Sequence, residues 1–432
     1  MVADTPSIAF VTFGCPKNEV DSDRMAAAVD GSALALTDDV ATADIVVLNT
    51  CAFIQPAVEE SIAGFFDLHT GWRTERPGRR IVVAGCLPSR YGTDLADAMP
   101  EADAFVPVDQ EHRLLETLGT LLDIAAGSTA ARARLAPGPT AYLKVSEGCD
   151  RHCAYCTIPS IRGPFVSDTP DAIVAEARWL IEQGAREIVL VGQNIASYGV
   201  DLSGDSDLSS LLRRLDAIDE QFRIRLMYVQ PDGVTDALLE TIASSRHICH
   251  YLDIPVQHAS EAVLRRMGRP GDLGTLRALL DRIRAALPDV VLRTTVMAGF
   301  PGETDDDAAV LEEFIREARF DYAGVFVFSP EDGTRAARLP DQVPTGIAEE
   351  RAQRLRDIAD ETGIERAAGR VGETYTVLVE GPDDDGDLYG RTCGQAPEVD
   401  GITFIEAHVA PGTFVDVLVT GSAGYDLIGE VT

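Results

Sequence analysis

The sequence predicts an α/β protein with three domains, and three observations carry this prediction. The chain has 432 residues, whereas a single domain commonly holds about 150. Short apolar runs alternate with helical patterns over most of the chain, which is typical of parallel α/β folds. Beyond residue 369 only short β runs separated by Gly, Pro and Asp remain. We therefore expect a parallel α/β domain over 1–127, an incomplete parallel (βα)6 barrel over 140–368 and a small all-β barrel over 369–432.

The first domain is predicted from apolar runs that alternate with amphipathic stretches. Strands are expected at 7–12, 44–48 and 81–85. Helices are expected at 18–29, 56–69, 88–98 and 110–125. The following stretch, 125–140, is rich in small residues and proline, and we interpret it as a linker.

The second domain repeats a strand and a helix six times, which favours a parallel barrel with its chemistry at the carboxyl ends of the strands. Strands are expected at 141–146, 186–191, 222–228, 250–255, 290–297 and 322–328. Helices are expected at 169–184, 207–217, 234–244, 260–268, 273–287 and 305–318, with an Arg/Glu-rich helix at 346–369. Five β runs follow, which predicts the small barrel.

The chain is strongly acidic, with 37 basic and 70 acidic residues and a formal net charge of −33. Such a surface repels phosphate backbones and suits a basic protein partner, although a general acidic bias of the proteome would look the same. The first 30 residues lack the pattern of a secretory signal, and no stretch of about 18 apolar residues is present. We expect a cytoplasmic protein without a membrane segment, whose eight cysteines are ligands or thiols rather than disulfides.

Three cysteines in the sequence SEGCDRHCAYCTIP follow the first predicted barrel strand: Cys149, Cys153 and Cys156. Three thiolates can hold three irons of a four-iron cluster and leave the fourth iron open. An open iron can chelate S-adenosylmethionine, and an electron passed to the sulfonium releases a 5′-deoxyadenosyl radical. The alternative is a zinc site, but zinc prefers four ligands and no second cysteine pair lies near. Tyr155 is expected to cover the cluster or to pack in the core.

Three further cysteines each follow a predicted strand of the first domain: Cys15, Cys51 and Cys86. Because parallel strands end on the same edge of their sheet, these thiols should converge. The sequence therefore predicts a second three-cysteine cluster, the alternative being three buried structural thiols. Cys249 and Cys393 belong to neither group of three cysteines, and we interpret both as structural.

A few polar residues near the predicted strand ends are candidates for contact with a cofactor. Gln193 and Asn194 follow a barrel strand and either bind S-adenosylmethionine or form a polar loop. Arg293 lies on a strand, where an unpaired buried charge would be costly, so we expect it to anchor the cofactor or a substrate carboxylate. Lys17 and Asn18 follow Cys15 and are candidates for tuning the second cluster.

The two cysteine trios, together with TFGCPKNEVDS, VLNTCAFI, VGQNIASYG, YLDIPVQHAS and TVMAGFPGET, resemble the radical-SAM methylthiotransferases over nearly the whole chain. The last domain resembles the TRAM barrel. This resemblance implies two 4Fe–4S clusters and S-adenosylmethionine as cofactors. It implies that the central cysteines bind and cleave S-adenosylmethionine in a radical-SAM barrel, and that the N-terminal cluster carries the sulfur. A reducing electron donor and a sulfide source would be needed.

AYLKVSEGC, IRLMYVQP and APEVDG resemble the branch that modifies an aspartate β-carbon of small-subunit ribosomal protein twelve. Another branch modifies a tRNA adenosine and stays as the alternative substrate. Residues 370–432 contain two basic residues against twelve acidic ones, a balance of −10. Such a domain would repel RNA and attract a basic ribosomal protein. An iron–sulfur electron carrier is a further alternative, which the barrel opposes because a carrier needs no cofactor cavity.

Overall fold

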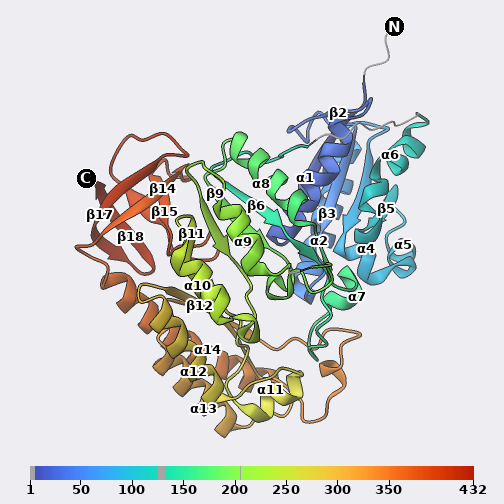
Figure 1. Cartoon of the computed structure of the whole chain (residues 1–432). Helices are drawn as coiled ribbons and strands as arrows, with labels where there is room; N and C mark the ends of the chain where they lie inside the picture. Colours follow the sequence, from blue (N-terminus) through green and yellow to red (C-terminus); the bar gives the residue numbers. More distant parts are fainter. Residues whose placement is uncertain (1–4, 125–131, 205) are drawn as a thin grey trace. The chain divides into compact units, whose positions relative to one another are not determined.

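The computed structural model describes residues 5–124, 132–204 and 206–432 (Figure 1). The chain forms two compact units. The first takes in the chain up to Ala136 with Gly148–Asp150 and Thr157–Pro164; the second holds Pro137–Glu147, Arg151–Cys156 and Phe165–Thr432. The expected linker at 125–140 lies partly outside the described residues. No helix in the described ranges is long and apolar enough to cross a membrane.

The first unit contains a five-stranded parallel sheet in the order β2-β1-β3-β4-β5. Its strands are β1 (Ser7–Thr12), β2 (Ala35–Leu36), β3 (Ile45–Thr50), β4 (Arg80–Gly85) and β5 (Ala104–Pro107). The three predicted strands form the centre of this sheet. The two outer strands, β2 and β5, were not predicted, because they are short and only partly buried.

Helices cover both faces of this sheet. They are α1 (Pro16–Asp30), α2 (Gln55–Asp67), α3 (Arg73–Glu75), α4 (Cys86–Tyr91), α5 (Thr93–Ala98), α6 (Leu114–Leu122) and α7 (Ile158–Arg162). Along β3, Ile45 and Val47 pack in the core with α1 and α6, while Val46 and Leu48 pack in the core with α2 and α4. A strand buried on both faces is apolar at most positions, which is why these strands read as nearly continuous hydrophobic runs.

The second unit contains a six-stranded parallel sheet whose strands follow chain order, β6-β9-β10-β11-β12-β13. They are β6 (Thr140–Lys144), β9 (Glu187–Val191), β10 (Arg223–Leu226), β11 (Ile248–Asp253), β12 (Val291–Ala298) and β13 (Tyr322–Val327). This arrangement confirms the predicted incomplete (βα)6 barrel. A two-stranded ribbon, β7 (Ser146–Glu147) with β8 (Val166–Ser167), was not predicted.

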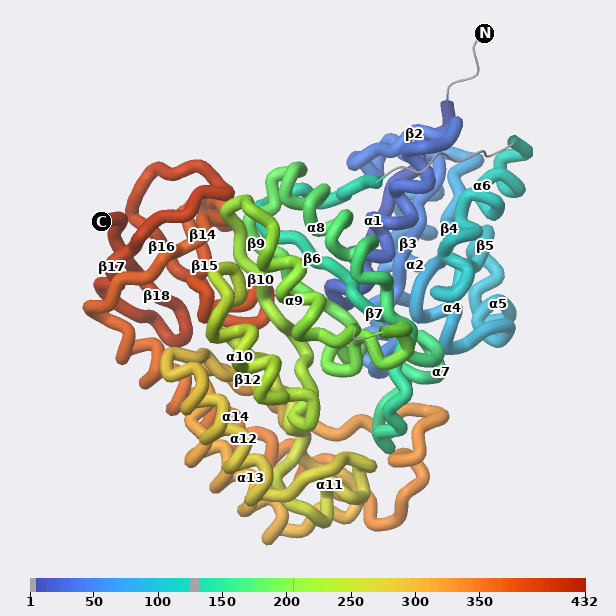
Figure 2. Tube along the Cα trace, viewed as in Figure 1, coloured from blue at the N-terminus to red at the C-terminus, as the bar shows by residue number. Residues whose placement is uncertain are grey.

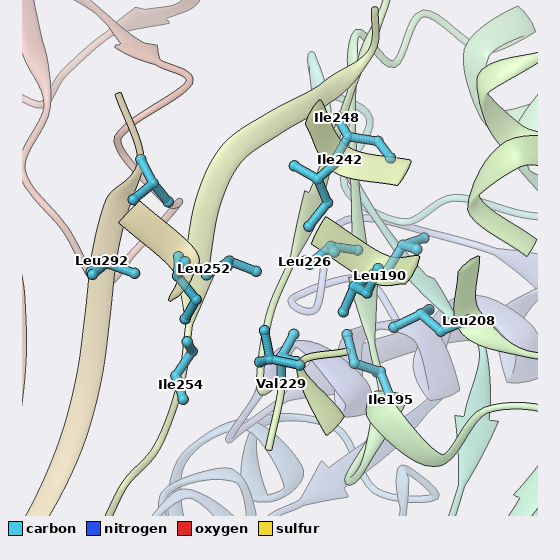
Figure 3. Packing of buried hydrophobic residues seen from close by; sticks show 14 of the residues in the cluster. Leu190, Ile195, Leu208, Leu226, Val229, Ile242, Ile248, Leu252, Ile254 and Leu292 are labelled. Carbon is cyan, nitrogen blue, oxygen red and sulfur yellow. The ribbon is translucent and has the colours of Figure 1, made fainter. Parts of the chain in front are cut away.

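The helices of the barrel lie within a few residues of the predicted ranges. They are α8 (Pro170–Glu182), α9 (Leu208–Asp216), α10 (Asp236–Ser244), α11 (Glu261–Met267), α12 (Leu273–Ala286), α13 (Asp305–Ala318) and α14 (Thr345–Ala368). A row of buried leucines crosses four neighbouring strands at one level: Leu190, Leu226, Leu252 and Leu292 (Figure 3). This row belongs to the main apolar core of the unit.

The C-terminal strands form a closed barrel in the order β14-β15-β16-β18-β17, as the sequence predicted (Figure 2). They are β14 (Thr374–Pro382), β15 (Leu388–Thr392), β16 (Thr403–Ile405), β17 (Phe414–Ala423) and β18 (Asp426–Val431). Valines and an isoleucine share the small core: Val377, Val379, Ile405 and Val417. Closure leaves no open strand edge.

A buried charge cluster joins this small barrel to the parallel sheet. Glu187 on β9 accepts hydrogen bonds from Arg225 Nε at 2.6 Å and from Arg223 Nε at 2.6 Å. Arg391 on β15 donates to the same carboxylate at 3.2 Å. Burial raises the pKa of Glu187, but the three guanidinium groups outweigh burial and hold that pKa well below its usual range. The small barrel is therefore anchored to the sheet through a carboxylate that stays ionised.

Candidate functional site

The N-terminal cysteines lie at the carboxyl ends of three neighbouring parallel strands. Cys15 follows β1 and precedes α1, Cys51 directly follows β3, and Cys86 directly follows β4 and begins α4. Cys51 and Cys86 are buried, and Cys15 is partly buried. The structure thus brings the three thiols to one edge of one sheet, as the strand-end pattern predicts.

The turn after β1 passes directly over Cys51. Gly14 adopts a φ of +105°, and a Cβ atom placed on it would lie 2.5 Å from Cys51 Cβ. Only glycine tolerates both this backbone conformation and this approach. The local sequence Phe13-Gly14-Cys15 is therefore what lets the first cysteine approach the second.

The strand order explains why a ligand site lies at this edge. From β1 the chain moves outward to β2 and then returns past β1 to form β3, so the order reverses between β1 and β3. In open α/β sheets, ligands bind outside the carboxyl ends of the strands at such a switch point. Cys15 and Cys51 flank this switch point, and Cys86 follows the next strand, β4.

The environment of these thiols favours their neutral form unless a cation is bound. Burial raises the pKa of Cys86 to about 12, against the opposing effect of the Arg162 guanidinium. Burial also raises the pKa of Cys51, and the nearby Cys15 adds to this effect. Metal ligation requires thiolates and releases their protons. The three cysteines therefore suit an iron cluster, because the positive charge of the irons would compensate the negative charges of three buried thiolates.

Two polar side chains hold the thiols in place. Asn18, predicted as a candidate, accepts a hydrogen bond from Cys15 Sγ at 3.4 Å and donates to the Thr50 carbonyl oxygen at 2.8 Å. Arg162 on α7 donates to Cys86 Sγ at 3.2 Å and to Asn18 Oδ1 at 3.1 Å. Sequence reasoning missed Arg162, because no local pattern indicates a contact that spans 76 residues.

The central cysteines follow β6 and β7 in a loop that is fixed through its backbone. In the first unit, the Cys149 N–H donates to the Gly163 carbonyl oxygen at 3.2 Å. In the second unit, the Ala154 N–H, between Cys153 and Cys156, donates to the Met267 carbonyl oxygen at 2.7 Å. Cys149 is buried, and the other two cysteines are partly buried.

Tyr155 lies between the second and third central cysteines. Its ring packs edge-on against Phe300, with 6.5 Å between the ring centroids, inside an apolar cluster. Burial raises the pKa of its phenol well above the usual range. The packing role is thus observed, and the covering of a cluster stays a prediction.

Neither trio forms a site for one metal ion: in the described part of the chain, no three His, Cys, Asp or Glu side chains are arranged in that way. A four-iron cluster distributes its thiolate ligands over separate irons rather than gathering them around one ion. The two trios are candidates for that kind of centre.

Several buried oxygen atoms at the carboxyl ends of the barrel strands have no hydrogen-bond partner among the residues that the structure describes. They are Ser146 Oγ, Gln193 Oε1, Asn194 Oδ1 and Gln230 Oε1. The amide nitrogens of Gln193 and Asn194 are satisfied, by Glu147 and Ser197, at 2.7 Å each. A buried acceptor without a donor costs about 1–3 kcal/mol. These atoms therefore fit a ligand that carries N–H and O–H donors, such as the amino and ribose hydroxyl groups of S-adenosylmethionine.

Sequence reasoning missed Ser146 and Gln230. The signal for Gln230 was available, because it follows β10 as Gln193 follows β9.

Arg293 lies near the beginning of β12 and is paired with two carboxylates. Its Nη1 donates to Asp253 Oδ1 at 3.1 Å, and its Nε lies 3.4 Å from Asp400 Oδ1. Asp253 and Asp400 thus supply the anionic partners that a buried arginine needs, and contact of Arg293 with the cofactor or a substrate carboxylate stays a prediction.

Comparison with known proteins places these features in a family. The Radical SAM superfamily matches residues 143–315, the Uncharacterized protein family UPF0004 matches residues 7–107, and the TRAM domain matches residues 371–432. The ribosomal protein uS12 methylthiotransferase RimO of Geobacter sulfurreducens is 40% identical over 98% of both chains. The RimO proteins of Lachnoclostridium phytofermentans and Desulfosudis oleivorans are 39% and 41% identical over 98% of this chain and 99% of their own. The chain belongs to the RimO family.

Among solved structures, this RimO family member is similar to the radical S-adenosylmethionine methyltransferase TsrM of Kitasatospora setae. The TM-score is 0.58 at 13% identity, over 86% of this chain and 80% of that chain. The cobalamin-dependent radical enzyme OxsB gives a TM-score of 0.53 at 12% identity, over 83% of this chain and 56% of that chain. At these identities the likeness concerns the fold alone. The three family matches cover both cysteine trios of this RimO family member and its small barrel.

Proposed function

We propose that this protein is a radical S-adenosylmethionine methylthiotransferase that adds a methylthio group to the β-carbon of an aspartate in ribosomal protein uS12. The observation that carries the proposal is the placement of Cys15, Cys51 and Cys86 at the carboxyl ends of three neighbouring strands of the first sheet, beside its switch point. An enzyme that only cleaved S-adenosylmethionine would need the central trio alone. A second trio in a chain of the RimO family is what sulfur insertion requires.

Each trio has its own role in this proposal. Cys149, Cys153 and Cys156 would hold the cluster that binds S-adenosylmethionine, and Cys15, Cys51 and Cys86 would hold the second 4Fe–4S cluster. When bound, the clusters and S-adenosylmethionine supply the electron, the radical and the methylthio group. Gln193 and Asn194 would orient S-adenosylmethionine through their unpaired oxygens. An external electron donor and a sulfide source are needed as co-reactants.

The small barrel would recognise the substrate protein through charge. Residues 371–432 contain one Lys or Arg, Arg391, and its side chain is 3% exposed. Asp384, Asp385 and Asp387 are exposed in the loop between β14 and β15. Asp383 shapes this loop by accepting hydrogen bonds from the backbone N–H groups of Asp385 and Asp387, at 3.0 and 2.8 Å. An exposed surface without a free cation attracts a basic ribosomal protein and repels RNA phosphates.

The test is anaerobic reconstitution with iron, sulfide, S-adenosylmethionine, a chemical reductant and purified uS12. We expect 5′-deoxyadenosine together with one methylthio group on an aspartate of uS12, located by peptide mass spectrometry. Unmodified tRNA serves as the control substrate. The methylthio group on tRNA instead of uS12 would refute the proposed substrate, and failure to form any 5′-deoxyadenosine would refute the enzyme class.

A further inference from the structure

We propose that Arg162 is a positioning residue for the N-terminal cluster: its guanidinium holds the Cys86 sulfur and raises the reduction potential of the cluster bound there. This inference rests on the proposed function, since it requires a cluster on Cys15, Cys51 and Cys86. It assigns a role to a side chain that lies outside both cysteine trios.

The geometry places one cation against one ligand sulfur. Arg162 Nη2 donates to Cys86 Sγ at 3.2 Å, and Arg162 Nη1 donates to Asp21 Oδ2 at 2.6 Å. The side chains of Arg162 and Asp21 are 2% and 1% exposed. Arg162 Nη2 also donates to Asn18 Oδ1, the same oxygen that accepts from Cys15 Sγ. One guanidinium thus touches one thiol directly and a second thiol through one amide.

A purely structural role explains this arrangement poorly. Removing a guanidinium and a carboxylate from water has a large desolvation cost, and a buried ion pair often adds no net stability compared with apolar residues of similar size. Besides pairing with Asp21, the guanidinium of Arg162 also contacts the Cys86 sulfur, and this is the contact to which we assign a role. A cation that donates a hydrogen bond to a cluster ligand stabilises the more negative, reduced state.

The Arg162–Asp21 pair is oriented with its positive group toward the Cys86 sulfur. Removing either charge should therefore shift the reduction potential of the cluster, in opposite directions for the two residues. The positive end of the pair contacts Cys86, and Asp21 contacts the other nitrogen of the guanidinium. Removing the arginine charge should make reduction harder. Removing only the Asp21 charge should take away negative charge near the cluster and make reduction easier. A residue that served only packing would give no such pair of opposite shifts.

The experiment uses the full chain with Cys149, Cys153 and Cys156 replaced by Ala, so that only the N-terminal cluster can form. The cluster is reconstituted anaerobically, and its potential is measured by redox titration followed by electron paramagnetic resonance. In Arg162→Gln we expect the ratio of reduced to oxidised cluster at a fixed potential to fall about tenfold, a downward shift of about 59 mV for one electron. Asp21→Asn should shift the potential upward, and Arg162→Lys should retain most of the wild-type value.

The control is Arg79→Gln. Arg79 is a buried arginine of the same unit whose hydrogen bonds go to the carbonyl oxygens of Trp72 and Ala41 and to the Glu75 carboxylate, and to no cysteine in the described part of the chain. Its loss should lower stability and leave the potential unchanged. An Arg162→Gln variant that binds its cluster fully and keeps the wild-type potential overturns the inference and leaves the proposed function intact.

If Arg162→Gln fails to fold or to hold iron, Asp21→Asn decides: an upward shift supports the inference and an unchanged potential overturns it. A chain lacking the central trio that binds no iron at all would instead contradict the proposed function.

Discussion

Arg391 of the small C-terminal barrel donates a hydrogen bond to Glu187 of the parallel sheet at 3.2 Å, and both side chains are buried. The same carboxylate also accepts from Arg223 and Arg225. Replacing Glu187 by Gln would leave three guanidinium groups without their shared anion. We expect Glu187→Gln to lower the free energy of unfolding by about 3–5 kcal/mol, measured by urea denaturation. Glu261→Gln, which breaks an exposed pair with Arg265, is the control and should cost under about 1 kcal/mol.

The pH dependence of that difference follows from the lowered pKa of Glu187. A carboxyl group whose folded pKa lies below its unfolded value stabilises the fold fully above the unfolded value, about 4.3 for Glu. This contribution is lost as the pH falls through the folded value. The difference in unfolding free energy between wild type and Glu187→Gln should therefore be constant at neutral pH and shrink below about pH 4. A difference that grew on acidification would contradict the ion-pair account.

The N-terminal trio should hold its own cluster. Replacing Cys15, Cys51 and Cys86 together by Ala should reduce bound iron from about eight to about four per chain. The variant should still form 5′-deoxyadenosine, because the central trio is intact, but should transfer no methylthio group. Iron analysis and mass spectrometry of uS12 measure these results. Cys249→Ala should keep both clusters, and a triple variant with full iron content would refute the assignment.

The unpaired oxygens of Gln193 and Asn194 should contribute to S-adenosylmethionine binding. We expect Asn194→Ala to weaken the affinity of the cluster-loaded enzyme about tenfold, since a lost hydrogen bond in a buried site costs about 1–3 kcal/mol. Gln193→Ala should act in the same direction. Equilibrium dialysis with labelled cofactor measures the change. Gln183→Ala, at the exposed end of α8, is the matched control and should bind normally; equal affinities in all variants would exclude the site.

The acidic loop of the small barrel should control docking of uS12. Replacing Asp384, Asp385 and Asp387 by Asn, while keeping Asp383 to preserve the turn, should weaken binding about tenfold at low salt, since each exposed pair contributes about 0.2–1 kcal/mol. The salt dependence of the affinity should also become shallower. A variant with an equal charge change at exposed positions of the parallel barrel provides the control: Glu182, Glu220 and Glu240 replaced by Gln. If the two variants bind uS12 with equal affinity, the overall negative charge of the chain attracts the substrate and this loop has no special role.

Cys393 should be an unusually reactive thiol. Cys393 is exposed, and a hydrogen bond from Cys249 and the charges of Arg223 and Arg225 outweigh its partial desolvation and lower the pKa of Cys393 to about 6. Alkylation of Cys393, followed by peptide mass spectrometry on cluster-loaded protein, should reach half its maximal rate near that pH. Cys249→Ala should move the midpoint upward, toward the ordinary value of 9.0. A wild-type midpoint already near the ordinary value would show that the two thiols do not interact.

The strands that the sequence predicts well are those whose hydrophobic pattern reflects burial in the core. The centre of the first sheet and the six barrel strands appear as apolar runs because helices cover both faces. The sequence does not predict β2 and β5, because neither forms a continuous apolar run: β2 has only two residues, and β5 is an outer strand that is only partly buried. The cysteine trio was predictable for a related reason, since parallel strands end together and each thiol follows a strand.

The interactions that the sequence does not predict are contacts between distant segments. Arg162 reaches Cys86 across 76 residues, and Arg391 reaches Glu187 across 204. The sequence predicts that Cys249 and Cys393 are structural thiols but not that they are neighbours, and packing of the small barrel on the sheet brings them together. Such contacts depend on how helices, strands and domains pack against one another, and the local periodicity of the sequence does not reveal that packing.

The buried carboxylate under the small barrel has a consequence for substrate selection. Because Arg391 ties the small barrel to Glu187 of the sheet, we expect its acidic loop to stay at a fixed distance from the carboxyl ends of the barrel strands. A ribosomal protein held on its acidic loop would offer the barrel mouth only those residues that its own backbone can bring there. The aspartate that is modified would then be chosen by its distance from the docking contact more than by the chemistry of its neighbours.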